Sequence, residues 1–435
     1  MRDLSIYIHI PFCVRKCLYC DFLSAPVCDG QIENYVNLML REIKEQSVFY
    51  GDHRVISIFL GGGTPSLLPT RETGRILEQI RNGFAVAEDV EITIECNPGT
   101  VTAEKLKNYI TCGINRLSIG LQSTDDEELA RIGRIHGYSD FRRTYTMARE
   151  AGFHNINIDL MAGLPGQSIA SYRKTLERVV AHSPEHISAY SLILEEGTLL
   201  YVNRKAYTFP DEETDREMYE LTGRFLGEAG FHRYEISNYA AEGRECRHNK
   251  VYWRRGDYVG FGLGASSMVG NVRWKNPDEH AEYAACVEKM ESDGQREAAR
   301  ISMRQGAQGT QGTGTGADRA VRIAEAETNP AMRMKKEGAW NRMFAESLRN
   351  TGRCEVQPLT PQEQMEEFMF LGLRLTEGVD LEEFRQYFGK NADEIYGKQM
   401  RTFVEQGLME REGPRLKLTP RGIDVSNAVF AEFLL

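Results

Sequence analysis

The stretch LSIYIHIPFCVRKCLYC, residues 4–20, decides which fold to expect. Its first part, Leu4–Ile10, is mostly apolar, a pattern typical of a strand buried on both faces of a parallel sheet. The second part is a loop with cysteines at positions 13, 17 and 20, directly after the strand. We therefore expect a buried strand whose C-terminal end carries three closely spaced thiols.

The same alternation of strand and helix patterns continues to about residue 240. Five more apolar runs follow, separated by amphipathic helical segments: Val55–Leu60, Val90–Glu95, Arg116–Gly120, Ile156–Leu160 and His186–Tyr190. A glycine pattern recurs at 112–116, 151–155 and 229–233 (CGINR, AGFHN and AGFHR), where a helix should end at the glycine before the next strand. About six such units predict an α/β fold with a partial, open TIM-like β/α barrel.

The length of 435 residues indicates more than one domain. We expect a barrel domain with an extension over 1–285, an insertion or linker over 286–359, and a small helical winged domain over 360–435. Residues 304–319 (RQGAQGTQGTGTGADR) are almost free of apolar side chains, which predicts a mobile insertion. Thr360 followed by Pro361 predicts a helix start, where we expect order to resume, and residues 408–419 predict a β-hairpin as the wing.

Composition narrows the classes of partner. The chain has 53 Lys and Arg against 63 Asp and Glu, and its net charge of −10 gives no general attraction to nucleic acid. The wing therefore suits a structural or lid role better than DNA binding. No run of about 18 apolar residues is present, and residues 1–10 lack the features of a secretory signal, so we expect a cytoplasmic protein.

The spacing of Cys13, Cys17 and Cys20 carries the strongest chemical signal. Thiolates favour iron–sulfur clusters, zinc or Cu(I), and three of them can bind three irons of a [4Fe–4S] cubane. The fourth iron then stays open to the amino and carboxylate groups of S-adenosylmethionine. One alternative is a structural zinc site completed by Cys28 or His9, and another is a set of free buried cysteines.

Further candidate ligand contacts lie at the ends of the following strands. The segment GGGTPS at 61–66 exposes backbone that could bind an ammonium group, and it lacks the Gly-Lys-Ser/Thr ending of a phosphate loop. Polar side chains then close successive strands, either as ligand contacts or as caps of the strand ends: Glu95, Gln122 and Asp159. Arg134 is a candidate for pairing a ligand carboxylate, against the alternative of a surface arginine.

A last cluster is HNKVYW at 248–253. A histidine beside two aromatic residues is compatible with ligation of haem iron under a covered porphyrin face. The same composition also suits a packing cluster at the end of a helix. From the residues alone, both interpretations stay open.

Taken together, these motifs resemble the oxygen-independent coproporphyrinogen III oxidase family of radical-SAM proteins, and within it the HemW-type haem-chaperone branch. The resemblance rests on the cysteine loop and on GGGTPS (61–66), ECNPG (95–99), RLSIGLQS (116–123), NIDLMAGLPGQ (157–167), HNKVYW (248–253) and FMFLGLRLTEGV (368–379). It implies a [4Fe–4S] cluster on Cys13, Cys17 and Cys20, and haem at His248. It also implies S-adenosylmethionine contacts by Tyr7, Tyr19, Gly62, Gly63, Thr64, Glu95, Gln122, Arg134 and Asp159.

Two features separate the branches of this family. The family's dehydrogenases carry a fourth cysteine two residues after the third, where this chain has Phe22, and an extension before the first strand. The resemblance therefore implies a chaperone that binds haem and passes it to haem-accepting proteins, with a small electron-donor protein and a peripheral membrane contact as further partners. The alternative is an oxygen-independent coproporphyrinogen III oxidase of porphyrin biosynthesis, so enzymatic activity stays open.

Overall fold

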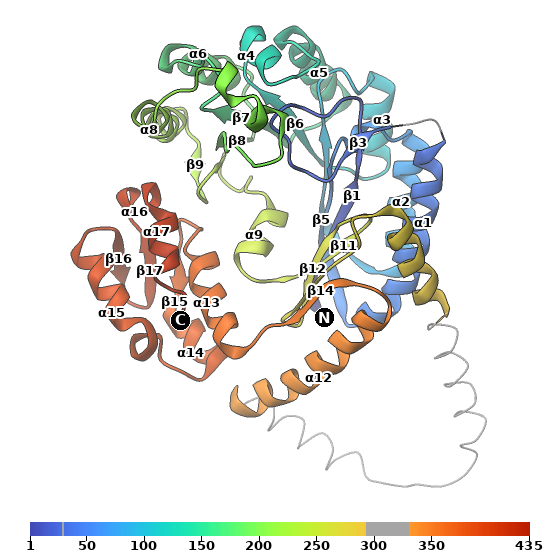
Figure 1. Ribbon diagram of the computed structural model, residues 1–435, viewed down its shortest axis with the longest axis vertical. Coiled ribbons are helices and arrows are strands. Elements are labelled where there is room, and N and C mark those ends of the chain that lie inside the picture. The colour runs from blue at the N-terminus through green and yellow to red at the C-terminus, as the bar shows by residue number, and fades with distance from the viewer. Residues whose placement is uncertain (28–29, 293–329) are drawn as a thin grey trace. The chain divides into compact units, whose positions relative to one another are not determined.

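The computed structural model describes residues 1–27, 30–292 and 330–435 (Figure 1). These residues form two compact units, one of 1–250 with 261–263 and the other of 251–260 with 264–435. The predicted mobile insertion at 304–319 lies outside the described residues. The division at 285 and 359 therefore stays a prediction.

The first unit is built on six parallel strands, in the order β1 (Arg2–Ile10), β4 (His53–Gly62), β5 (Ala85–Cys96), β6 (Arg116–Gln122), β7 (Ile156–Ala162) and β8 (His186–Ser191). Each contains one of the six predicted runs, which confirms the partial barrel of about six units. The short strands β10 (Asn238–Ala240) and β9 (His232–Arg233) add to β8 in antiparallel fashion. The third glycine-ended unit therefore does not extend the parallel row.

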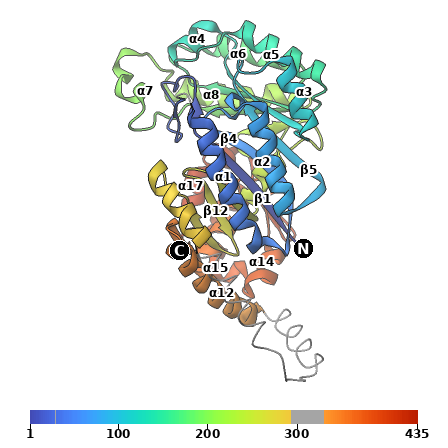
Figure 2. The same cartoon turned by 90° about the vertical axis from the view of Figure 1, so that its right-hand side faces the viewer.

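Helices cover the outer face of this row. They are α1 (Gln31–Ser47), α2 (Thr70–Gly83), α3 (Ala103–Thr111), α4 (Asp126–Arg131), α5 (Tyr138–Ala151), α6 (Ile169–Val180) and α8 (Glu212–Glu228). Figure 2 shows α1 and α2 side by side over β1 and β4. The predicted glycine stop is confirmed at Gly152, which ends α5 with φ of 105°, a left-handed conformation that favours glycine.

The two faces of the strands differ in chemistry. The outward side chains of β1, such as Leu4, Ile6 and Ile8, have no exposed surface. The inward face is polar, because the Ser5 and Ser57 hydroxyls are hydrogen-bonded at 2.6 Å and the inner positions of β5–β8 include buried charged and amide groups. The expectation of strands apolar on both faces is therefore wrong for the inner face, where polar groups bond to one another instead of packing.

The second unit contains the antiparallel strands β11 (Asp257–Phe261, whose last residue belongs to the first unit), β12 (Ser266–Val269), β13 (Val272–Lys275) and β14 (Cys354–Pro358), with helix α12 (Pro330–Asn350). Ordered structure thus precedes Thr360, where we expected it to resume. As predicted, Thr360 caps α13 (Pro361–Gly372). Its hydroxyl accepts from the Glu363 backbone N–H, and the Glu363 carboxylate accepts from the Thr360 backbone N–H.

The end of the chain forms the predicted small helical domain with a wing. Its elements are β15 (Val379–Asp380), α14 (Leu381–Phe388), α15 (Ala392–Glu405), β16 (Met409–Glu412), β17 (Arg415–Leu418), α16 (Pro420–Asp424) and α17 (Ser426–Ala431). The predicted hairpin is the β16–β17 pair, and β15 adds to β17 as a third strand. Among the described helices of both units, none has the length and apolarity needed to cross a membrane.

Candidate cofactor site

The carboxyl ends of the parallel strands surround a cavity of about 680 Å³, part of which is open to solvent. Ligand sites of β/α barrels lie at this end of the strands. Eleven of the thirteen residues predicted from the sequence line the cavity: Cys13, Cys17, Tyr19, Cys20, Gly62, Gly63, Thr64, Glu95, Gln122, Arg134 and Asp159. Their individual roles stay predictions, but their convergence brings three thiols, two carboxyls and a guanidinium to one place.

The cysteine loop is fixed at both of its ends. The two-residue strands β2 (Phe12–Cys13) and β3 (Ala25–Pro26) pair where the loop begins and ends, and the Leu18 backbone N–H donates to Ile132 O at 3.0 Å. All three cysteines are free thiols. The loop can therefore present them to a ligand without a disulfide in the way.

Each thiol receives a hydrogen bond. Thr64 Oγ1 donates to Cys13 Sγ at 3.6 Å, and Arg134 Nη1 donates to Cys17 Sγ at 3.5 Å. Burial raises the pKa of the Cys20 thiol, while a hydrogen bond from the Phe22 backbone acts to lower this pKa. Hydrogen-bonded sulfurs are common around iron–sulfur clusters, where they help to set the potential.

The geometry tests the zinc alternative. Among the residues that the structure describes, no three His, Cys, Asp or Glu side chains are grouped so that they could hold a single metal ion. His9 is engaged elsewhere, because its Nε2 lies 2.8 Å from Leu23 O and its Nδ1 lies 3.2 Å from the Tyr7 hydroxyl. Cys28 lies outside the described residues. A cubane, which spreads its ligands over separate irons, fits the donor set better than one zinc ion.

The glycine segment lies against the start of the cysteine loop. The Gly63 backbone N–H donates to Ile10 O at 2.8 Å, and a Cβ on Gly63 would lie 2.8 Å from Phe12 O. Only glycine allows this approach of two backbones. The Gly62 N–H donates to the Glu95 carboxylate at 3.2 Å, which joins the segment to the end of β5.

Two partly buried carboxyl groups give the cavity its electrostatic character. Burial, and then the charge of Asp159, raises the pKa of Glu95 to about 8. Burial also raises the pKa of Asp159, although Asn157 Nδ2 donates to it at 2.7 Å and Ser118 Oγ donates at 3.2 Å. Two poorly solvated carboxyls attract a cationic ligand group, which would relieve their repulsion.

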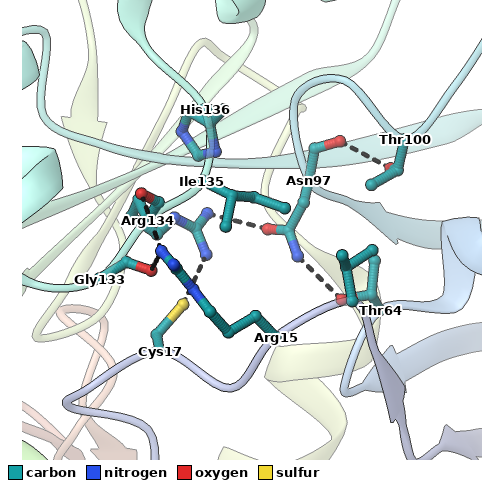
Figure 3. Close-up of a pocket in the computed structure, with 10 residues that line it drawn as sticks. Arg15, Cys17, Thr64, Asn97, Thr100, Gly133, Arg134, Ile135 and His136 are labelled. Carbon is teal, nitrogen blue, oxygen red and sulfur yellow. Dashed lines mark hydrogen bonds between the residues drawn. The ribbon is translucent and has the colours of Figure 1, made fainter. Parts of the chain in front are cut away.

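Arg134 supplies the opposite charge on the other wall. Its guanidinium donates to Cys17, to Asn97 and to Gly120 O, while its Nε has no hydrogen-bond partner within the described part of the chain. An orphaned buried donor fits a ligand carboxylate. Figure 3 shows this guanidinium beside Cys17 and Asn97, in an adjoining pocket of about 320 Å³.

The two remaining predicted residues do not line the cavity. His248, on α9 (Arg247–Trp253), is only 2% exposed, and its ring stacks on Phe59 with centroids 5.1 Å apart. Its Nδ1 lies 2.9 Å from Ser57 Oγ, and burial lowers its pKa to about 3. Tyr7 packs beside it on the inner face of β1, with ring centroids 6.4 Å apart.

The sequence interpretation missed Asn97, which lies in both pockets. It belongs to the quoted ECNPG segment, where only Glu95 was singled out. The available signal was Asn-Pro-Gly, which predicts a turn after a strand. That signal does not say what the asparagine side chain bonds to.

Comparisons with known proteins found related families and relatives. Residues 7–179 match the model of the radical SAM superfamily, and residues 359–425 match the HemN C-terminal domain. The heme chaperone HemW of Bacillus subtilis is 31% identical over 433 residues, which cover 99% of both chains. HemW of Escherichia coli is 41% identical over 271 residues, 62% of this chain and 71% of that protein.

A solved structure shares the fold. The coproporphyrinogen III oxidase HemN of Escherichia coli, described as a radical SAM enzyme, superposes with a TM-score of 0.76. The superposition covers 100% of this chain and 90% of that chain at 21% sequence identity. At this identity the likeness concerns the fold, an open α/β barrel followed by a small C-terminal domain.

Proposed function

The chain belongs to the HemW family of heme chaperones among the radical-SAM proteins, and from this we propose that it binds a [4Fe–4S] cluster, S-adenosylmethionine and haem, and delivers haem to haem proteins. The observation that carries the proposal is the meeting of three free thiols, two carboxyls and one guanidinium in a single cavity. The full-length similarity to named heme chaperones favours delivery over catalysis as the role of this site.

In this proposal Cys13, Cys17 and Cys20 hold the cluster. When bound, the cluster supplies an electron to the sulfonium group of S-adenosylmethionine. The two carboxyls, Glu95 and Asp159, line the same cavity and would hold the ligand's ammonium group. Arg134, whose Nε lacks a partner among the described residues, would pair with the ligand's carboxylate.

Haem is the third proposed ligand. The family resemblance assigns it to His248, whose burial and bond to Ser57 withhold the imidazole from an external iron. Ligation by His248 therefore requires the start of α9 to leave its place against β4. Haem-accepting proteins and a small electron-donor protein complete the set of proposed partners.

The test begins with anaerobic reconstitution with iron and sulfide. The parent should bind about three to four irons and show visible cluster absorption, while Cys17→Ala should lose most of both. Cys112→Ala is the matched control, because Cys112 is also a free, half-buried thiol but does not line the cavity. Full retention of iron and absorption by Cys17→Ala would contradict the proposed ligand set.

The second step separates a chaperone from an oxidase. The reconstituted protein is incubated with haem, or with coproporphyrinogen III, S-adenosylmethionine and a reductant. Stoichiometric haem binding without decarboxylated product supports the chaperone. Multiple-turnover decarboxylation would mean that the protein is an oxidase and not a chaperone. It would also mean that Phe22, at the cavity wall, does not exclude that reaction.

A further inference from the structure

Asn97 is held in place by a tight turn after β5. The Thr100 N–H donates to Asn97 O at 3.1 Å, Gly99 has φ of 85°, and Pro98 precedes it, which together describe a type II turn. The Thr100 hydroxyl also donates to Asn97 O at 2.6 Å, and it lies 2.7 Å from Ser66 Oγ. The turn is thereby tied to the glycine segment.

The orientation of the Asn97 amide follows from its two partners. Arg134 can only donate, so the atom that faces its Nη2 at 2.8 Å must be the Asn97 carbonyl oxygen. The amide nitrogen then faces Thr64 Oγ1, to which it donates at 2.9 Å. Figure 3 shows Asn97 between these two residues.

This orientation directs two further hydrogen bonds onto sulfur. Because the Thr64 oxygen accepts from Asn97, its single hydrogen is free to point at Cys13 Sγ, 3.6 Å away. Because Nη2 of Arg134 is held by Asn97 together with Gly120 O, Nη1 is turned toward Cys17 Sγ, 3.5 Å away. The Asn97 side-chain amide thus contacts both residues that donate to these thiols, Thr64 and Arg134.

We infer that Asn97 is a positioning residue that directs hydrogen bonds from Thr64 and Arg134 onto Cys13 and Cys17, and thereby raises the reduction potential of the cluster. The inference rests on the proposed cluster site. Hydrogen bonds to cluster sulfurs stabilise the reduced, more negative state, so they raise the potential.

The nearly isosteric change Asn97→Asp tests this inference. A carboxylate still accepts from Arg134, but toward Thr64 it also accepts, so the threonine hydrogen turns from Cys13 to the carboxylate. The lost bond to sulfur and the added negative charge both disfavour reduction. We expect at least a tenfold fall in the equilibrium constant for one-electron reduction, about 59 mV, in a redox titration followed by electron paramagnetic resonance.

A second variant separates the hydrogen bond from the charge. Thr64→Val removes the donor to Cys13 and should by itself lower the reduction potential. Thr64→Ser keeps a hydroxyl donor and should have a potential close to that of the parent. In the Thr64→Val background, Asn97→Asp should lower the potential by less than it does in the parent. Equal shifts in both backgrounds would overturn the inference, because the charge alone would then account for the effect.

Iron and sulfide content separates this inference from the proposed cluster site. If the parent binds no cluster, the proposed site fails. If parent and Asn97→Asp both carry a full cluster and unfold at the same temperature, but have equal potentials, the positioning role of Asn97 fails while the cluster site stands. Asn97→Ala adds a neutral comparison, in which a smaller fall in potential is expected and an unchanged potential would again contradict the inference.

Discussion

Nδ1 of His248 lies 2.9 Å from the hydroxyl oxygen of Ser57, on the inner face of β4. The imidazole is 2% exposed and is stacked on Phe59 at 5.1 Å. A residue that the family resemblance connects with haem is therefore part of the interior of the first unit. If His248 is the iron ligand, haem binding requires the imidazole to leave this buried position.

The Ser57 bond should weaken haem binding if His248 is the iron ligand, because the competent state is then only partly populated. Ser57→Ala removes that bond, whose net contribution is about 0.5–1.5 kcal/mol, so haem affinity should rise roughly two- to tenfold. Haem titration followed at the Soret band measures this. Ser5→Ala is the control, since Ser5 contacts Ser57 but leaves the bond to His248 in place.

An unchanged affinity in Ser57→Ala, together with unchanged affinity in His248→Ala, would show that His248 is a packing residue. That was the other interpretation of the HNKVYW segment.

The pH dependence of stability offers a separate test of His248. Burial lowers its pKa to about 3 from an unfolded value near 6.5, so the unfolded chain takes up a proton that the folded chain does not. This contribution to stability is complete above pH 6.5 and is lost as the pH falls toward 3. We expect the free energy of unfolding to fall more steeply with decreasing pH in the parent than in His248→Gln, by up to about 1.4 kcal/mol per pH unit. Urea unfolding at pH 4.5–7 measures both slopes; parallel slopes would mean that His248 is accessible to protons in the folded state.

The six strands of the first unit could be predicted because buried parallel strands are continuous apolar runs. The polar inner face was missed, since a residue such as Ser57 finds its partners, Ser5 and His248, only in elements that lie far apart in the sequence. The same reason explains Asn97, whose partners Thr64 and Arg134 are 33 and 37 residues away. Predicted residues such as Glu95 and Asp159 were found because strand ends meet at one edge, a consequence of topology alone.

Gly63 should tolerate no side chain. A Cβ there would lie 2.8 Å from Phe12 O and 3.0 Å from Ile10 O, both backbone atoms that cannot rotate away. Gly63→Ala should therefore displace the glycine segment from the cysteine loop, lower the free energy of unfolding by about 1–3 kcal/mol, and weaken S-adenosylmethionine binding at least tenfold. Equilibrium dialysis and urea unfolding measure the two effects.

Gly74 provides the matched control in α2. Its added Cβ would meet only Cys112 Sγ at 3.6 Å, an ordinary contact. Gly74→Ala should leave ligand binding unchanged and stabilise the protein by about 0.5–1 kcal/mol, because alanine favours the helix. Equal binding by Gly63→Ala and Gly74→Ala would contradict the proposed contact of the glycine segment with the ligand.

Binding of S-adenosylmethionine should release a proton from the carboxyl pair. Burial and the charge of Asp159 raise the pKa of Glu95 to about 8, so near pH 7 the free protein holds a proton that a bound ammonium group would expel. Affinity should therefore increase with pH between 6 and 7.5, where the ligand's amino group stays protonated, by up to tenfold per pH unit. The pH dependence of folding stability without ligand has the opposite sign to that of ligand affinity. The protonated carboxyl favours the folded state, and that stability is lost as the pH rises from about 4.5 to 8.

Glu95→Gln should flatten the pH profile of binding measured by isothermal calorimetry. Glu104→Gln, an exposed change on α3, should retain the profile of the parent. A parent profile that is already flat would contradict the prediction, because Glu95 would then either be ionised in the free protein or lie away from the bound ammonium group.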